Sequence, residues 1–191
     1  MKNYITALGI AVTTALPHAA HAQSVTPPSV PASIQVDPPS EAFLLGHGVG
    51  TQNYVCQPST SLGRVAWTLF TPQATLFSDL GEQLTTHFFS PNPVEGGLVR
   101  VTWEDSEDTS IVWARAIASV VVTPDAIPWL KLQTVGTQVG PTGGATLTQT
   151  TFIQRVNTVG GVAPPTGCDR LPDVGHKAFV PYTADYFFYR N

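Results

Sequence analysis

The chain has 191 residues, of which 42% are hydrophobic and only 12% are charged. Charged residues usually make up roughly 25% of a soluble domain, so this chain is poor in ions yet apolar enough to form a core. Its formal net charge is -4, with three lysines and no cluster of arginines. This balance excludes the basic surface that nucleic acids or an anionic membrane surface would require.

The first 22 residues have the pattern of a secretory signal peptide. Lys2 supplies the positive end, residues 4–16 form a mostly apolar run, and residues 20–22 read small-x-small. Cleavage after Ala22 would release a secreted or periplasmic protein. No later apolar stretch approaches the roughly 20 residues that a membrane helix needs, so no membrane span is expected.

Two cysteines follow the predicted cleavage point, Cys56 and Cys168. In an exported chain, an even number of cysteines is best interpreted as a disulfide. The Cys-x-x-Cys spacing that is typical of redox and metal sites is absent. A single bridge is therefore predicted to join the beginning of the fold to its end.

The predicted domain organisation has three parts. Residues 1–22 are the signal peptide, and residues 23–40, with five prolines, are predicted to form a stiff leader rather than core. Residues 41–191 are predicted to form a single β domain. Within it, we expect a short helical turn over residues 41–45 and a loop over the glycine-rich residues 46–50.

The body of the chain is rich in Val and Thr, which favour strands, and turn residues recur at short intervals. Strands do not alternate with helical patterns, which predicts an all-β fold: an antiparallel β-sandwich or barrel with long loops. The expected strands cover residues 51–57, 64–70, 74–78, 83–89, 98–104, 110–122, 127–135, 145–156, 177–181 and 184–189.

One of these segments, residues 110–122, allows two interpretations. Its even positions, from Val112 to Val122, are uniformly small and apolar, which is typical of a strand with one tightly packed face. An alanine-rich helix is the alternative, because the acidic run at residues 104–108 would suit a helix start. We favour the strand and leave the helix open.

Motifs for known chemistry are missing. His47, His87 and His176 are too far apart to show the spacing of a metal site, so no metal or cofactor is predicted and each is expected to be a hydrogen-bonded surface or turn residue. Among the three, His87 is the strongest candidate for a functional role, because it ends a predicted strand in a run of aromatic residues. The acidic run 104–108 lacks the pattern of a calcium loop and is predicted to be a solvated turn. The glycines of residues 46–50 do not complete a dinucleotide-binding fingerprint.

The tryptophans and tyrosines are more numerous than the motifs explain. Most should lie in the core, while an exposed subset would form a stacking platform for a sugar or another ring-bearing ligand. Arg155 would serve as an anchor for an anion or a hydroxyl group. The candidate binding residues are His87, Trp103, Trp129, Arg155, Asp185 and Tyr186.

Several strings of residues carry a family resemblance. The most specific are IQRVNT followed by GG and AP within residues 153–164, and YTADY followed by FY within residues 182–189. With the landmarks at residues 50–56, 86–88, 101–104 and 126–130, they resemble the secreted bacterial and fungal family catalogued as domain of unknown function 3455.

The resemblance implies an exported, disulfide-bearing β domain without an agreed activity or known catalytic residues. Some fungal relatives carry a malate dehydrogenase label, which the incomplete glycine fingerprint does not support. Two stretches depart from the family pattern. Residues 89–100 look like an insertion, and residues 140–144 are elaborated.

We therefore expect an exported β domain that acts as a binding or envelope-associated module for a carbohydrate or a small molecule, rather than an enzyme. The alternative is a secreted metal-dependent or acid-base enzyme that uses His87 with Glu104 and Asp185. A pocket that gathers these three side chains would favour the enzyme. The sequence does not indicate an oligomeric state.

Overall fold

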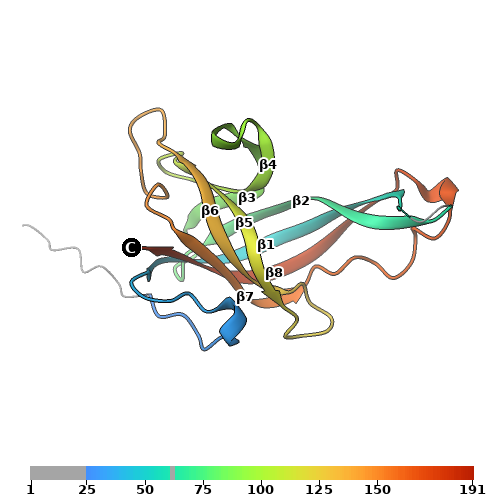
Figure 1. The fold of residues 1–191 in the computed structure, drawn as a ribbon, viewed down its shortest axis with the longest axis horizontal. Helices are drawn as coiled ribbons and strands as arrows, with labels where there is room; N and C mark the ends of the chain where they lie inside the picture. Colours follow the sequence, from blue (N-terminus) through green and yellow to red (C-terminus); the bar gives the residue numbers. More distant parts are fainter. Residues whose placement is uncertain (1–24, 61–62) are drawn as a thin grey trace, which may run out of the picture.

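In the computed structural model, which describes residues 25–60 and 63–191, the chain forms a closed barrel of eight antiparallel strands. The strands follow one another around the barrel in sequence order, and β8 pairs with β1 to close it (Figure 1). The strands are β1 (Glu41–Pro58), β2 (Val65–Phe77), β3 (Gln83–Asn92), β4 (Leu98–Asp105), β5 (Ile111–Val120), β6 (Trp129–Gln138), β7 (Phe152–Gly160) and β8 (Lys177–Arg190). Short 3-10 helices are η1 (Ala32–Ile34), η2 (Pro93–Glu95) and η3 (Leu171–Asp173). The predicted all-β class is confirmed, as a barrel. Residues 111–120 are strand, so the helix alternative is wrong.

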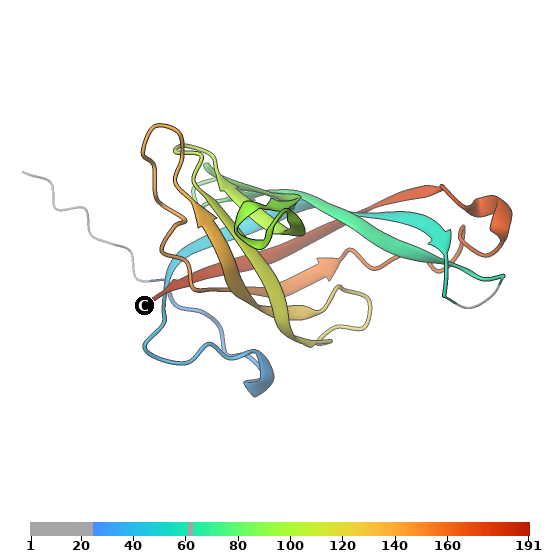
Figure 2. The same cartoon turned by 45° about the horizontal axis from the view of Figure 1, so that its top comes forward.

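Three long strands extend the barrel into an arm. The ends of β1, β2 and β8 project from one end of the barrel, and the chain between β7 and β8 runs along the arm to its tip (Figures 1 and 2). Cys56 and Cys168 form a disulfide there, with their Cα atoms 5.4 Å apart. The predicted bridge is confirmed, and it fits an oxidising compartment.

Two long strands continue through prolines at which the sequence predicts breaks. The predicted strands 64–70 and 74–78 are one strand, β2, which contains Pro72, and the predicted strands 177–181 and 184–189 are one strand, β8, which contains Pro181. β2 pairs with β3 only from Ala74 onward, and β8 pairs with β7 only from Tyr182 onward. Both prolines therefore lie where the pairing with one neighbouring strand has already ended, and a missing N–H is tolerated at such an edge.

The glycine-rich stretch is part of β1, so the helical turn expected at 41–45 and the loop expected at 46–50 are both wrong. Alternate residues of this stretch point into the barrel. A Cβ atom on Gly46 would lie 2.9 Å from the Leu76 side chain, and one on Gly48 would lie 2.7 Å from the ring of Tyr186. The glycines leave the space that these large interior side chains occupy.

The connection between β6 and β7 closes the end of the barrel opposite the arm. Its Leu147 is fully buried in the main apolar cluster. Only residues from Phe152 onward are strand, so the prediction of a strand over 145–156 is wrong for its first half.

Asp108 holds this connection in place. Its carboxylate accepts hydrogen bonds from the backbone N–H groups of Ser110 at 2.8 Å and Thr146 at 2.9 Å. Although burial opposes its ionisation, these hydrogen bonds hold the pKa of Asp108 well below its usual range. Residues 106–108 of the acidic run form a turn, as predicted, and Asp108 also anchors a second loop. The prediction is wrong for Glu104 and Asp105, which end β4, and Asp105 is buried.

A second apolar cluster lies outside the barrel wall. Ile34, in the proline-rich segment, is fully buried and belongs to one cluster with Val156, Phe187 and Tyr189. The Gln154 side chain donates to the carbonyl of Ile34 at 2.7 Å. The expectation that residues 23–40 lie outside the core is therefore wrong for Ile34. The predicted signal peptide and its cleavage site lie outside the described residues.

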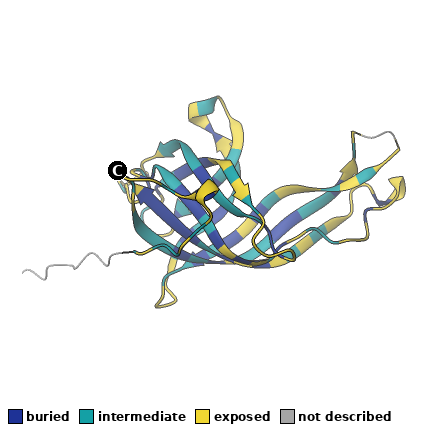
Figure 3. Cartoon of the chain, turned by 60° about the horizontal axis from the view of Figure 1, so that its bottom comes forward, coloured by how far each residue is buried: buried dark blue, intermediate teal, exposed yellow. Residues whose placement is uncertain are grey.

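Figure 3 shows that buried residues concentrate in the barrel, whereas the tip of the arm is mostly intermediate or exposed. The insertion-like stretch at residues 89–100 lengthens the hairpin of β3 and β4. Glu95 pairs there with Arg100 at 2.6 Å, and the Asn92 side chain caps η2. The barrel stays closed with this longer hairpin in place.

The close packing of β1 predicts that Gly50→Ala destabilises the fold. An added Cβ would lie 2.1 Å from the carbonyl oxygen of Gln73 and 2.5 Å from the Cα of Ala74, so β1 and β2 would have to separate. We expect a loss of about 1–3 kcal/mol in the free energy of unfolding. Urea unfolding followed by tryptophan fluorescence measures it. Val49→Thr, at an exposed neighbour, is the matched control, and equal stabilities of the two variants would contradict the prediction.

The disulfide is expected to contribute to stability without being needed for barrel closure. The double variant Cys56→Ser, Cys168→Ser should lose about 2–5 kcal/mol, because the unfolded chain regains the freedom of a long loop. Its far-UV circular dichroism should stay native, since the pairing of β1 with β8 runs from Glu41 to Val55 without the bridge. Wild type with and without reductant provides the comparison, and an unchanged urea midpoint would disprove the contribution.

Candidate functional site

The barrel is open at the end from which the arm projects. A cavity of about 460 Å³ enters it there, lined by inward-facing side chains of seven strands and by the loop before β6. Its walls are mainly apolar. The apolar lining includes Leu69, Phe89, Val101, Ala116, Leu130 and Leu132. We call this cavity the lumen pocket.

His87 lies at the floor of the lumen pocket. Its side chain is 2% exposed, and its ring stacks on Trp103 with centroids 4.3 Å apart. Nδ1 donates to the Thr102 carbonyl at 2.9 Å. Burial lowers the pKa of His87 to about 3. The ring is therefore neutral, and with the proton on Nδ1, Nε2 is a hydrogen-bond acceptor.

Two tyrosines lie beside this floor. The hydroxyl groups of Tyr182 and Tyr186 are 3.0 Å apart and buried. Burial raises the pKa of both phenols, and the positive charge of Arg155 offsets only part of that rise. Both rings therefore stay protonated and uncharged at neutral pH.

Arg155, on β7, shares the inward face of Ile153 and brings a positive charge into the lumen pocket. Its Nε and Nη2 donate to the Pro128 carbonyl at 3.2 and 2.8 Å, which fixes the guanidinium at the mouth. Within residues 25–60 and 63–191, no carboxylate lies within ion-pair distance of it. Its positive charge acts to lower the pKa values of Tyr54, His87 and both buried tyrosines.

Gln52 and Tyr54 are pocket residues that the sequence did not reveal. Gln52 is 2% exposed, and its Nε2 has no hydrogen-bond partner within the described chain. The Tyr54 hydroxyl donates to the Gly161 carbonyl at 2.7 Å. Both lie on the inward face of β1. Both lie within the predicted strand 51–57, but a short strand alone does not show which of its faces lines the open end of a barrel.

The six candidate binding residues do not form one site. His87 and Arg155 line the lumen pocket, whereas Trp103 and Tyr186 lie beneath it and are 0% and 1% exposed. Neither can present an open ring face to a sugar. Trp129 is partly buried against the outer apolar cluster. Asp185 is on the outside of the barrel, because the neighbouring Ala184 and Tyr186 face inward.

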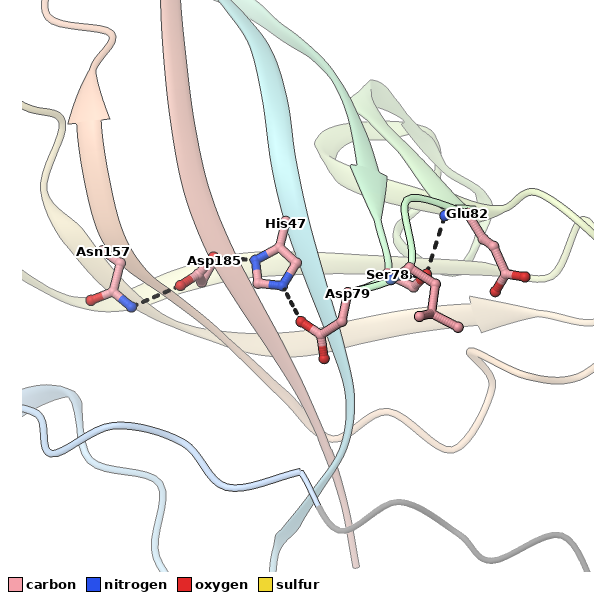
Figure 4. A network of polar contacts seen from close by, with 7 residues as sticks. His47, Ser78, Asp79, Glu82, Asn157 and Asp185 are labelled. Atoms are coloured by element: carbon pink, nitrogen blue, oxygen red, sulfur yellow. Dashed lines mark hydrogen bonds and ion pairs between the residues drawn. The ribbon is translucent and has the colours of Figure 1, made fainter.

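Asp185 belongs to a polar network on the outer face (Figure 4). His47 lies between two carboxylates, with Nδ1 2.7 Å from Asp185 and Nε2 2.8 Å from Asp79. Asn157 donates to the second oxygen of Asp185 at 2.7 Å. The network joins β8, β1, β7 and the turn between β2 and β3. His47 is a hydrogen-bonded surface residue, as predicted, whereas the same prediction is wrong for His87, which is buried.

The grouping needed for the alternative enzyme is not assembled. His87 faces the interior. Glu104 follows the inward-facing Trp103, and Asp185 lies between the inward-facing Ala184 and Tyr186. Because side chains alternate along a strand, both carboxylates face outward. The ring of His87 bonds to a backbone carbonyl and to no carboxylate. Among the described residues, no group of three or more His, Cys, Asp or Glu side chains is placed to hold a metal ion.

The His47 network predicts a pH-dependent contribution to stability. Hydrogen bonds to Asp79 and Asp185 raise the pKa of His47 above 6.5, since only the doubly protonated ring can donate to both. The folded chain then binds more protons than the unfolded chain between pH 6.5 and the raised value. The stabilisation is therefore complete below pH 6.5 and disappears as the pH rises through the folded-state pKa.

The variant His47→Gln tests this dependence. It should cost roughly 0.5–1 kcal/mol on the acidic side, a size typical of exposed ion pairs, and less on the alkaline side. Urea unfolding over a pH series measures the difference from wild type. His176→Gln is the control, because that ring lies 3.4 Å from the Gly167 carbonyl and outside the network. A difference that is constant with pH would contradict the assignment.

Comparisons with known proteins identify the family and nothing more specific. No curated protein matches the chain, and no solved structure matches it. A family model described as a protein of unknown function, DUF3455, matches residues 39–190, from the cis peptide before β1 to the end of β8. The match covers the whole barrel and its arm. The chain belongs to the DUF3455 family.

Proposed function

We propose that the protein is a binding module that takes up a small amphipathic molecule in the lumen pocket. One observation carries this proposal: the barrel is closed at the Leu147 end but keeps a cavity of about 460 Å³ at the arm end. A volume of this order is typical of small-molecule sites, which combine apolar walls with a few polar groups. Small eight-stranded barrels have room for one such ligand.

The pocket chemistry favours an amphipathic ligand over a carbohydrate. Sugars are bound by many hydrogen bonds and by exposed aromatic faces, and the rings of Trp103 and Tyr186 are buried. The walls offer aliphatic side chains and the ring of Phe89. The polar groups His87, Gln52 and Arg155 come from β3, β1 and β7 and would bind the polar end of the ligand.

The predicted export supports a role outside the cytoplasm. The disulfide fits a secreted or periplasmic chain, and the predicted cleavage after Ala22 would leave the barrel intact. In the part of the chain that the structure describes, no helix is long and apolar enough to cross a membrane.

Binding of the neutral fluorescent probe N-phenylnaphthylamine tests the proposal. Its fluorescence rises in an apolar environment, so titration into the purified barrel should give saturable binding with one site per chain. Ala116→Trp fills the mouth from an exposed position on the pocket wall and should weaken binding roughly tenfold or more.

Val121→Trp adds the same ring at a residue that is 63% exposed and does not line the pocket, and it should bind the probe like wild type. Circular dichroism confirms that both variants fold. Absence of saturable binding by the wild type, or equal binding by the two variants, would rule out the lumen pocket as the site.

A further inference from the structure

We infer that the ligand of the lumen pocket is a monocarboxylate amphiphile whose acid group binds Arg155 and whose apolar part lies along the pocket walls. This inference rests on the proposed function and names the class of ligand. It is carried by the charges and unpaired polar groups of the pocket.

The pocket is positively charged although the chain is not. The protein has a net charge of -4 and six arginines, and three of these, Arg100, Arg115 and Arg155, line the pocket, while no Asp or Glu does. Arg100 is paired with Glu95 at 2.6 Å. Arg115 bonds to the neutral Gln133 side chain at 3.1 Å, and Arg155 to a backbone carbonyl. Arg115 is exposed, alternates with the inward-facing Ala114 and interacts with the charge of Glu95. Arg155 is therefore the inward-facing cation that lacks a carboxylate partner among the described residues.

The groups around Arg155 cannot supply the missing negative charge. His87 is neutral, and Tyr182 and Tyr186 stay protonated because burial raises their pKa values. A cation in apolar surroundings is costly unless it has a partner of opposite charge. A bound anion would provide that partner, whereas a cationic ligand would be repelled.

The hydrogen-bonding groups match one planar acid group. A guanidinium has five N–H bonds, and the contacts to Pro128 use the Nε and Nη2 sides of Arg155. These contacts leave three N–H bonds of Arg155; its guanidinium also lies near the Tyr186 hydroxyl, and the remaining donors suit the two oxygens of a carboxylate. Gln52, deep in the same pocket, lies beside the Tyr182 hydroxyl, and its Nε2 makes no close hydrogen bond among the described residues. A buried donor of this kind costs free energy until a ligand accepts from it.

The apolar walls decide against a small inorganic anion. Leu130 is the cross-strand neighbour of Arg155, and Leu69 and Phe89 line the cavity from β2 and β3. Burying their surfaces would add to affinity for an alkyl or aryl chain. The acid group and the chain together account for both parts of the pocket.

The test is a competition series at about pH 7, where a fatty acid is ionised. Decanoate, decanol and decylamine share one alkyl chain and carry negative, zero and positive charge. Each displaces N-phenylnaphthylamine from the full-length mature protein. We expect decanoate to bind roughly tenfold or more tightly than decanol, and decylamine more weakly than decanol.

Arg155→Met should bring the Kd values of decanoate and decanol within about twofold of each other, since the charge is lost while most of the side-chain length is kept. Arg64→Met, at an exposed arginine outside the pocket, should keep the wild-type preference. The ratio of the two values within each variant is the readout, so a general change in pocket affinity cancels. Should Arg155→Met not fold, the wild-type series decides alone.

The outcomes separate the two proposals. Probe binding with equal affinities for decanoate and decanol would overturn the carboxylate assignment and leave the small-molecule site standing. A preference for decanoate that persists in folded Arg155→Met would overturn the role of Arg155. No probe binding by the wild type would overturn both.

Discussion

The close approach of β1 to the interior side chains is the constraint on which the barrel depends. β1 pairs with β2 on one side and with β8 on the other, so it closes the cylinder. At Gly46 and Gly48, the absence of a side chain allows Leu76 and Tyr186 to fill the space beside β1. Larger residues there would push β1 outward and break one of its two ladders. These two glycines therefore allow large side chains to fill one end of the barrel interior, while the lumen pocket occupies the other end.

Strand alternation then separates the polar groups into two sets. Inward positions hold His87, Gln52 and Arg155, where water is scarce and charges lack partners. Outward positions hold His47 and Asp185, which face solvent and pair with each other. The two histidines consequently respond to pH in opposite directions: burial lowers the pKa of His87, and the two carboxylates raise that of His47. As the pH falls, protonation stabilises the outer network and opposes burial of the inner ring.

The sequence predicted those parts of the fold that depend on local pattern and failed where long-range packing decides. Turn residues and Val- and Thr-rich runs located most strands, and an isolated pair of cysteines located the bridge. The glycines of residues 46–50 gave the opposite signal, because glycine is unfavourable in an isolated strand and is required here by the close approach of Leu76, Tyr186 and the backbone of β2. In the site, His87 and Arg155 were identified as single residues. Gln52 and Tyr54 lie in the predicted strand 51–57 but were not selected, because a strand alone does not show which of its faces lines a pocket. Asp185, which was selected, lies on the outer face.

The low charge content of the chain has its sharpest consequence in the lumen pocket. Ion pairs among the described residues are few: Glu95 with Arg100, Lys131 with Asp37, and His47 with Asp79 and Asp185. Arg155 is not in any of these pairs: it is held by the Pro128 carbonyl, which orients the guanidinium but does not neutralise it. A carbonyl partner needs no second charge in the wall, so the positive potential of the pocket is preserved. Replacing Pro128 as the acceptor by an acidic side chain would fix the arginine equally well and cancel the attraction for an anion, which is why the choice of a backbone acceptor favours a binding role for Arg155 over a purely structural one.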